Sequence, residues 1–151
     1  MMRAALSLAL ALLCINPAAA QERQWGLQMT DDDAYLMFGV PDTDDVGLSL
    51  WCRIGSGRMS LFLPVRGKAR AGQRLPLRLS AGGKTYRLRA KVTRDENSGK
   101  LDAEADLGRL SVIPKALAGA TSVRLRLNGA EAAFPLAEAD VAGLLAVCAK
   151  P

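Results

Sequence analysis

Residues 46–65, VGLSLWCRIGSGRMSLFLPV, decide the fold that the sequence predicts. Apolar side chains alternate with other side chains on both sides of a Gly-Ser-Gly segment, the pattern of two short antiparallel strands joined by a turn. With Ser56 and Gly57 as a two-residue turn, apolar residues meet on one face of the hairpin. The predicted pairs are Cys52 with Leu61, Leu50 with Leu63, and Leu48 with Val65. A three-residue loop would slip the register by one residue and mix the two faces, so we favour the first register.

Four large side chains fall on the other face of this hairpin and of the strand before it. Trp51 lies opposite Phe62 in the predicted register, and Tyr35 and Met37 can join them from the segment AYLMFGV. An exposed patch of this kind is typical of a site for a partner or a ligand. The alternative is that a second sheet covers the patch and makes it half of a sandwich core. The sequence leaves both interpretations open.

Two further hairpins are predicted from glycine-containing turns. In residues 74–94, a Gly-Gly turn at 82–83 sets Leu77 opposite Leu88 on one face and Arg78 opposite Arg87 on the other. In residues 122–135, an Asn-Gly pair at 128–129 is the strongest short-range hairpin signal in the chain. The segments WGLQMT and AYLMFGV read as two more strands, separated by the acidic turn at 31–33. The sequence therefore predicts several short antiparallel strands.

Directly opposed arginines destabilise a strand pair, so the hairpin at 74–94 needs an explanation. One explanation is an anionic partner on this face. The other is the next strand, residues 101–107, in which acidic residues alternate with leucine and alanine. Closing the loop over residues 95–98 gives three pairs of opposite charge: Lys91 with Asp102, Arg89 with Glu104, and Arg87 with Asp106. We favour this ladder of solvated ion pairs, although each exposed pair contributes only about 0.2 to 1 kcal/mol.

The last segment, LAEADVAGLLAVCAK, changes period from two to that of a helix. Val141, Leu144, Leu145 and Cys148 fall at i, i+3, i+4 and i+7, which forms one apolar stripe. A brief helical turn is also expected after Pro114. The periodicity thus places Cys148 on the buried face of a C-terminal helix.

The first twenty residues have the three parts of a secretory signal peptide. Arg3 precedes a short apolar run, and small residues at 18 and 20 form an A-x-A ending. Acylation of Cys14 after cleavage is the alternative, but the residue before it is leucine rather than a small residue. We expect cleavage after Ala20, a single domain over 21–151 without a transmembrane segment, and a periplasmic or secreted location in a bacterium.

Two cysteines, Cys52 and Cys148, remain after this cleavage. An even number of cysteines in an oxidising compartment predicts a disulfide, here one that closes nearly the whole domain. The cleaved chain has a net charge of +4, since Arg3 is the one charge lost from a chain of net charge +5. That charge is too small and too dispersed to predict a nucleic-acid partner.

The chain contains no histidine, which excludes Ser-His-Asp and Cys-His catalysis and every histidine-ligated metal site. Phosphate-binding and dinucleotide-binding motifs are also missing, so no cofactor is expected. Paired carboxylates are the remaining candidates for general acid–base catalysis. The segment PDTDDVG offers Asp42, Asp44 and Asp45 as candidates for a cation or for acid–base work, but it lacks the spacing and closing Glu of an EF-hand.

Two segments together resemble a known kind of protein. An acidic pair, apolar strands and a cysteine ending a strand occur in DDDAYLMFGVPDTDDVGLSLWCRIGSGRMSLFL, and a terminal helix with a second cysteine occurs in FPLAEADVAGLLAVCAK. This arrangement resembles small exported accessory proteins associated with type VI secretion, and other exported bacterial proteins of unknown function. The resemblance covers the two ends of the chain and leaves the middle hairpins unassigned. It implies an envelope protein, and it assigns no role to any single residue.

Taken together, the sequence predicts a mainly β (α+β) fold, an antiparallel β sandwich or flattened barrel with a C-terminal α-helix. The expected function is that of a small exported, disulfide-stabilised, non-enzymatic envelope protein. It would act as an accessory or inhibitor by binding another envelope or secreted protein. A lipid or small-molecule binding protein is the first alternative, because many alanines stand opposite large residues. A carboxylate-dependent hydrolase is the second.

Overall fold

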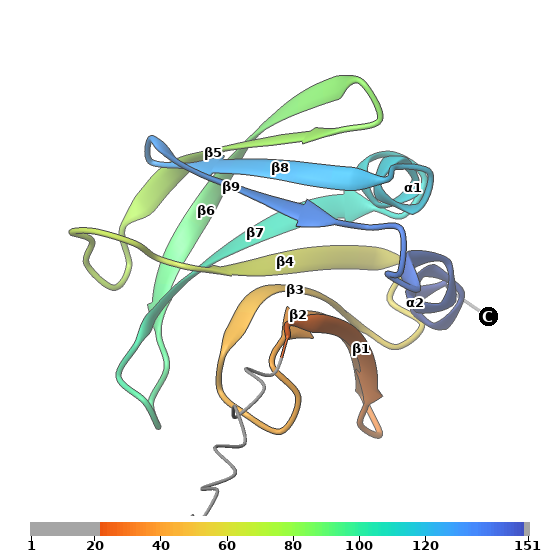
Figure 1. The fold of residues 1–151 in the computed structure, drawn as a ribbon, viewed down its shortest axis with the longest axis horizontal. Coiled ribbons are helices and arrows are strands. Elements are labelled where there is room, and N and C mark those ends of the chain that lie inside the picture. Colours follow the sequence, from red (N-terminus) through yellow and green to blue (C-terminus); the bar gives the residue numbers. More distant parts are fainter. Residues whose placement is uncertain (1–21, 150–151) are drawn as a thin grey trace, which may run out of the picture.

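A computed structural model describes residues 22–149 and contains nine strands and two short helices (Figure 1). The expected signal peptide, residues 1–20, lies outside the described residues. Within residues 22–149, no helix is both long and apolar enough to cross a membrane. The elements are β1 (Gln24–Met29), β2 (Asp33–Gly39), β3 (Val46–Arg53), β4 (Arg58–Pro64), β5 (Arg74–Ala81), β6 (Lys84–Arg94), β7 (Leu101–Arg109), α1 (Ile113–Ala118), β8 (Ser122–Leu127), β9 (Ala130–Pro135) and α2 (Val141–Cys148).

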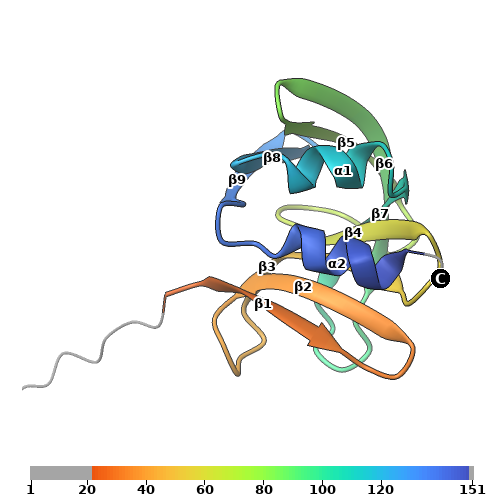
Figure 2. The ribbon, with the colours of Figure 1, turned by 90° about the vertical axis from the view of Figure 1, so that its right-hand side faces the viewer.

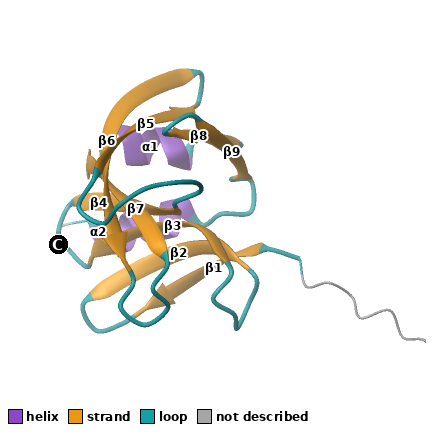
Figure 3. Cartoon of the chain, turned by 90° about the vertical axis from the view of Figure 1, so that its left-hand side faces the viewer, coloured by secondary structure: helices purple, strands orange, loops and turns teal. Residues whose placement is uncertain are grey.

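All nine strands form one antiparallel sheet in the order β1-β2-β3-β4-β7-β6-β5-β8-β9. The sheet curls into a half-barrel, so the mainly β class and the C-terminal helix are confirmed, in the barrel form rather than the sandwich form. Figure 2 shows α1 and α2 lying across one end of the curled sheet. Figure 3, from the opposite side, shows loops at the other end. The helices therefore close one end of the half-barrel and leave loops to surround the other.

The hydrophobic core lies on the concave face of the sheet. Strand residues alternate between buried and exposed, as β8 shows most regularly, because successive side chains point to opposite faces. Leu36, Leu50, Leu61, Leu79 and Leu125 are each almost completely buried on this face. Leu117 of α1 and Leu144 of α2 pack into the same core from the closed end. The apolar alternation of the sequence thus decides which face turns inward in β2 to β8, whereas β1 is exposed along almost its whole length.

Two of the three predicted hairpins have the predicted register. In β5–β6, Leu77 pairs with Leu88 and Arg78 with Arg87. In β8–β9, the Asn-Gly turn places both of its residues at positive φ, 48° at Asn128 and 88° at Gly129. That backbone conformation matches the right-handed twist of the flanking strands and is accessible to Asn and Gly at low cost. Local turn chemistry is therefore enough to predict these two registers.

The predicted register of the β3–β4 hairpin is wrong by two residues. Leu50 pairs with Leu61, not Leu63, and a four-residue connection, 54–57, replaces the two-residue turn. The N–H groups of Gly55 and Gly57 donate to the carbonyls of Val147 and Cys148 at the end of α2. These bonds to a distant helix hold the longer loop in place. A shift of two residues keeps every side chain on its predicted face, so Cys52 still points inward.

The register of β6 against β7 is also shifted by two residues, which removes the predicted ion-pair ladder. Lys91 lies opposite Glu104, not Asp102, and the pairing of the two strands ends there. The Asp95 carboxylate accepts hydrogen bonds from the N–H groups of Asn97 and Ser98, which builds a longer loop than predicted. On the N-terminal side of Lys91, β6 no longer pairs with β7. Arg87 and Arg89 consequently have no acidic neighbour on β7.

The two edge strands, β1 and β9, approach each other without pairing through their backbones. The indole N–H of Trp25 on β1 donates to the carbonyl of Pro135 on β9, at 2.6 Å. The ring of Phe38 lies between, with its centroid 5.3 Å from that of Trp25 and 5.8 Å from that of Phe134. We call this line of contact the seam. Side chains, together with one hydrogen bond, hold it closed.

The predicted disulfide is confirmed. Cys52 and Cys148 are bonded, their Cα atoms lie 5.8 Å apart, and both residues are buried. The bond joins the inner face of β3 to the last residue of α2. It therefore fastens the helix that closes one end of the half-barrel to the sheet.

Candidate functional site

The open end of the half-barrel contains a cavity of about 1090 Å³ on the concave side of the sheet. Its apolar wall comes from strands far apart in the sequence, β2, β4, β8 and β9. The larger apolar side chains that line it are Phe38, Leu63, Leu125, Leu127 and Phe134. The loops β2–β3, β4–β5 and β6–β7 contribute polar residues around its opening, which we call the mouth. Figure 3 shows these loops at the end away from the helices.

Small residues at several inward positions leave this space unfilled. Ala130 and Ala132 occupy inward positions of β9, and both line the cavity. Gly47 of β3 also lines it, and a Cβ atom there would lie 3.2 Å from the ring of Phe134. At the closed end, α1 and α2 fill the corresponding volume. The cavity is therefore a consequence of where small residues and helices fall along the chain.

Ion pairs cross the mouth of the cavity. Arg23 and Asp45 lie 2.6 Å apart, and Lys100 and Asp44 are also 2.6 Å apart. The hydrogen bond from Lys100 lowers the pKa of Asp44, and Asp44 in turn raises the pKa of Lys100. Burial raises the pKa of Asp102, which lines the cavity just inside. The mouth is thus polar and contains charges of both signs, whereas the wall beneath it is apolar.

The three candidate aspartates of the PDTDDVG segment do not converge on a common point. Asp44 and Asp45 are each engaged by a cation of the mouth, and Asp42 is an exposed loop residue at positive φ. Across residues 22–149, no group of three or more Cys, Asp or Glu side chains is arranged to hold a metal ion. These three carboxylates therefore lie in the β2–β3 loop beside the mouth and do not form a common site.

The four large side chains singled out on the other face do come together. The rings of Tyr35 and Trp51 stack at 6.1 Å, and those of Trp51 and Phe62 at 5.8 Å, across β2, β3 and β4. Met37 shares their face and stands in register with Ser49. All four are half-buried, and no second sheet of the described chain covers them. Tyr35, Trp51 and Phe62 form what we call the aromatic stack.

Two polar atoms beside the aromatic stack have no hydrogen-bond partner among the described residues. They are the hydroxyl oxygen of Ser49 and the indole nitrogen of Trp51, and both atoms are inaccessible to solvent. Ser49 as a whole is only 7% exposed. A buried polar group without a partner costs about 1 to 3 kcal/mol, so most are satisfied in native proteins. The convex face of β3 therefore has two buried polar atoms without hydrogen-bond partners among the described residues, which we call the polar deficit of β3.

The aromatic stack and the disulfide were predictable from the sequence, but the position of the cavity was not. Alanines opposite large residues, Ala132 of β9 among them, suggested a carrier without showing where its space lay. Comparisons with known proteins add no further guide: no family model, no curated protein and no solved structure matches this chain.

Proposed function

We propose that this protein is a non-enzymatic carrier that binds a small amphipathic molecule in the cavity of the half-barrel. The observation that carries the proposal is the combination of an apolar wall, lined by Phe38, Leu125 and Phe134, with a charged mouth. Ligand sites typically have about 300 to 1,000 Å³ of concave, mostly apolar space with a few polar groups that orient the ligand. The cavity, at about 1090 Å³, lies just above the upper end of that range and has the same division of polarity.

The chemistry of the lining indicates the class of ligand. Burying an apolar chain against leucine and phenylalanine side chains contributes roughly 25 cal/mol per Å² of apolar surface removed from water. A polar or charged head group can remain at the mouth, where Arg23, Lys100 and their carboxylate partners offer hydrogen-bond donors and acceptors. A lipid or fatty acid fits this arrangement better than a compact polar metabolite.

We place the carrier outside the cytoplasm, in the periplasm or secreted. A disulfide and the lack of a membrane-spanning helix within residues 22–149 are compatible with an exported protein. The A-x-A ending of the first twenty residues is the sequence support for export. The resemblance to type VI secretion-associated accessory proteins stays a prediction beside this proposal.

Filling the cavity tests the proposal directly. Ala132→Trp places a large ring into the cavity, whereas Ser122→Trp places the same ring on the exposed face of neighbouring β8. We expect the parent protein and Ser122→Trp to bind cis-parinaric acid, a fluorescent fatty acid, and Ala132→Trp to lose at least tenfold in affinity. Native mass spectrometry of the parent should also show a co-purified small molecule. Equal affinity of the two variants would contradict the proposal.

A second candidate function, binding of a protein partner through the aromatic stack, is favoured by the partial exposure of its three rings. A partner that contacts Tyr35, Trp51 and Phe62 would bury aromatic surface that the described chain leaves partly open. Aromatic residues of this kind dominate the energetics of many interfaces. The partner would be another envelope or secreted protein.

Site-specific photocrosslinking separates this second function from the first. A photoreactive residue at Met37, beside the stack, should give a discrete adduct in cells, whereas one at Thr85, on the outer face of β6, should give none. Adducts at both positions or at neither would contradict a partner at the aromatic stack. Neither result changes the expectation for fatty-acid binding.

A further inference from the structure

Three arginines lie side by side across the outer face of the sheet. Arg78 of β5 pairs with Arg87 of β6 on one side and with Arg126 of β8 on the other. Facing Cα atoms of neighbouring strands are about 4.5 to 5.5 Å apart, so the three guanidinium groups share one small area. We call Arg87, Arg78 and Arg126 the arginine row.

More cations surround the arginine row. Arg74 pairs with Lys91 next along β5 and β6, Arg89 lies opposite Pro76, and Arg124 lies opposite Ser80. All of these cations are exposed. The surface over β5, β6 and β8 is therefore strongly positive, although the net charge of the whole chain is modest.

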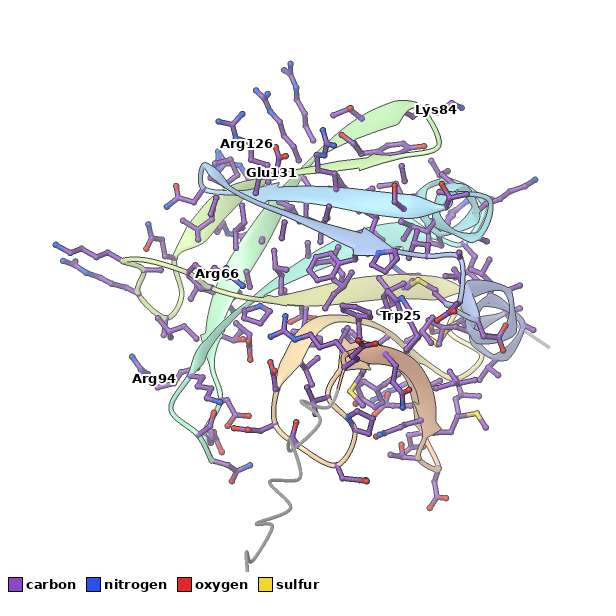
Figure 4. The ribbon with its side chains drawn as sticks, in the orientation of Figure 1. Trp25, Arg66, Lys84, Arg94, Arg126 and Glu131 are labelled. Atoms are coloured by element: carbon purple, nitrogen blue, oxygen red, sulfur yellow. A yellow bond between two sulfur atoms is a disulfide. The ribbon has the colours of Figure 1, made fainter. Side chains whose placement is uncertain are left out.

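The rest of the described chain neutralises this charge only in part: Glu131 of β9 stands opposite Arg126, and Glu104 of β7 stands opposite Lys91. No carboxylate among residues 22–149 lies within 4.0 Å of a side-chain nitrogen of Arg78, Arg87 or Arg126. Asp106, the expected partner of Arg87, pairs with Arg58 instead. Glu131 is bonded to Arg124 at 3.4 Å, and Figure 4 shows it close to Arg126 near the β8–β9 turn.

The arginine row destabilises the sheet through charge repulsion, and the strand register does not allow the repulsion to be relieved. Like charges directly opposite each other destabilise a strand pair, here twice in succession. The register cannot slip to relieve the repulsion, because Leu77, Leu79 and Leu125 on the same strands are buried in the core. Among residues 22–149, neither Arg78 nor Arg87 forms an ion pair, and places where a sequence breaks a local rule in this way are characteristic of functional sites.

The side chains between the arginines indicate the kind of partner. Outward positions of β5, β6 and β8 between the cations hold Pro76, Ser80 and Thr85, with no aromatic ring among them. Single-stranded nucleic acid is usually held by rings that stack on its bases, and protein interfaces usually have an apolar or aromatic centre. Neither feature is present on this face, which offers guanidinium groups alone.

We propose that the outer face of β5, β6 and β8 docks on a membrane surface through the phosphate groups of anionic phospholipids. Guanidinium groups bind phosphate oxygens through two parallel hydrogen bonds, and lipid head groups can move laterally to meet cations on a convex face. Each basic residue near an anionic bilayer strengthens binding about fivefold. The proposal does not depend on the cavity, since it concerns the opposite face of the sheet.

Vesicle sedimentation tests this proposal with a variant of unchanged shape. Full-length mature protein should bind vesicles of phosphatidylglycerol and phosphatidylcholine, should bind pure phosphatidylcholine much more weakly, and should be released as the salt concentration rises. Combining Arg78→Gln, Arg87→Gln and Arg126→Gln should weaken binding roughly 100-fold, from about fivefold per arginine. The matched control combines Arg53→Gln, Arg70→Gln and Arg109→Gln, which removes the same charge elsewhere and should cost less than fivefold.

Each other result overturns the proposal. Equal losses in the two triple variants would reduce the effect to net charge alone. Failure of the parent protein to bind phosphatidylglycerol vesicles would exclude a membrane surface. Tighter binding to a DNA duplex or to poly-glutamate than to the vesicles would replace the membrane with a different polyanion. Circular dichroism spectra should show that both triple variants are folded like the parent protein. We expect this because removing like charges from the arginine row relieves repulsion rather than creating it.

Discussion

Cys52 and Cys148 are the two residues that fix the last helix to the sheet. They are separated by 96 positions in the sequence, and the loop that their bond closes contains every strand from β4 onward. Closing a loop of this length removes much of the conformational freedom of the unfolded chain. The same bond holds Val147 and Cys148 where their carbonyls accept from the loop that follows β3. The bond therefore acts on both the unfolded and the folded state.

Replacing either cysteine by alanine should lower the free energy of unfolding by about 4 to 5 kcal/mol, the chain-entropy value for a loop of roughly 100 residues. The double replacement should cost little more than either single one, since each removes the same bond. Urea denaturation of the three variants measures this. Additive losses would mean that the two sulfur atoms act independently. Separately, intact-mass analysis should show that the unreduced parent protein is two hydrogen atoms lighter than the reduced protein.

Trp51 tests the meaning of the polar deficit on β3. Trp51→Phe keeps a stacked ring between Tyr35 and Phe62 but removes the unpartnered indole N–H. Removing the unpartnered N–H should recover about 1 to 3 kcal/mol of unfolding free energy. This gain should offset most of the free energy lost with the contacts of the larger indole ring. We expect a change in unfolding free energy within about 1 kcal/mol for Trp51→Phe and a loss of about 2 to 3 kcal/mol for Trp51→Ala. Equal losses would show that the N–H is satisfied in solution.

At the scale of strands and hairpins, the sequence predicts registers well where a turn depends only on its own residues. The Gly-Gly turn at 82–83 and the Asn-Gly turn at 128–129 are such cases. It fails where a loop depends on something distant or on a side chain within the loop. The loop at 54–57 is held by carbonyls of α2, and the loop after β6 is built on Asp95. In both cases the error is two residues, because burial fixes which face each side chain takes.

The arginine row predicts a stability change that runs against the usual effect of substitution. Arg78→Gln removes the central charge, which faces Arg87 and Arg126 on both sides. The free energy of unfolding should rise by about 0.2 to 1 kcal/mol at low ionic strength, and the gain should shrink as salt screens the repulsion. Thermal denaturation at two salt concentrations measures both effects.

Arg53→Gln is the matched control for this prediction. Arg53 stands opposite Asp33, so it faces a charge of the opposite sign. The same substitution there should leave stability unchanged or lower it slightly. If Arg78→Gln destabilised the protein at low salt, the three arginines would not repel one another as their register implies.

At the scale of the whole molecule, neither the curl of the sheet nor the cavity could be read from the sequence. Alternation tells which face of each strand is apolar, but it does not tell how nine strands bend or which end the helices cover. The cavity is lined by Ala130 and Ala132 together with Phe38 and Leu63, which come from strands far apart in the sequence. Such volumes depend on the relation between distant strands, which local patterns do not encode. The disulfide was predictable because it depends on a count of cysteines rather than on shape.

The seam should be the part of the sheet that opens most readily. Backbone amides of β1 and β9 should exchange with deuterium faster than those of β4 and β7, which are paired on both sides. Trp25→Phe removes the hydrogen bond to Pro135 and should accelerate exchange in β1 and β9 together while leaving β4 unchanged. Hydrogen-exchange mass spectrometry resolves these segments. Slow exchange in β1, equal to that of β4, would show that the seam is as firmly closed as the rest of the sheet.

The seam also determines how the interior can respond to guests of different size. In a closed barrel, the number of strands and their stagger fix the circumference, so the bore has a single width. Here the first and last strands meet through Trp25, Phe38 and Phe134, and no ladder of backbone bonds sets their separation. We therefore expect the perimeter of the half-barrel to be adjustable. For the carrier that we propose, one scaffold of unchanged strand number would then accept ligands of different width, each at the cost of separating the three aromatic rings of the seam.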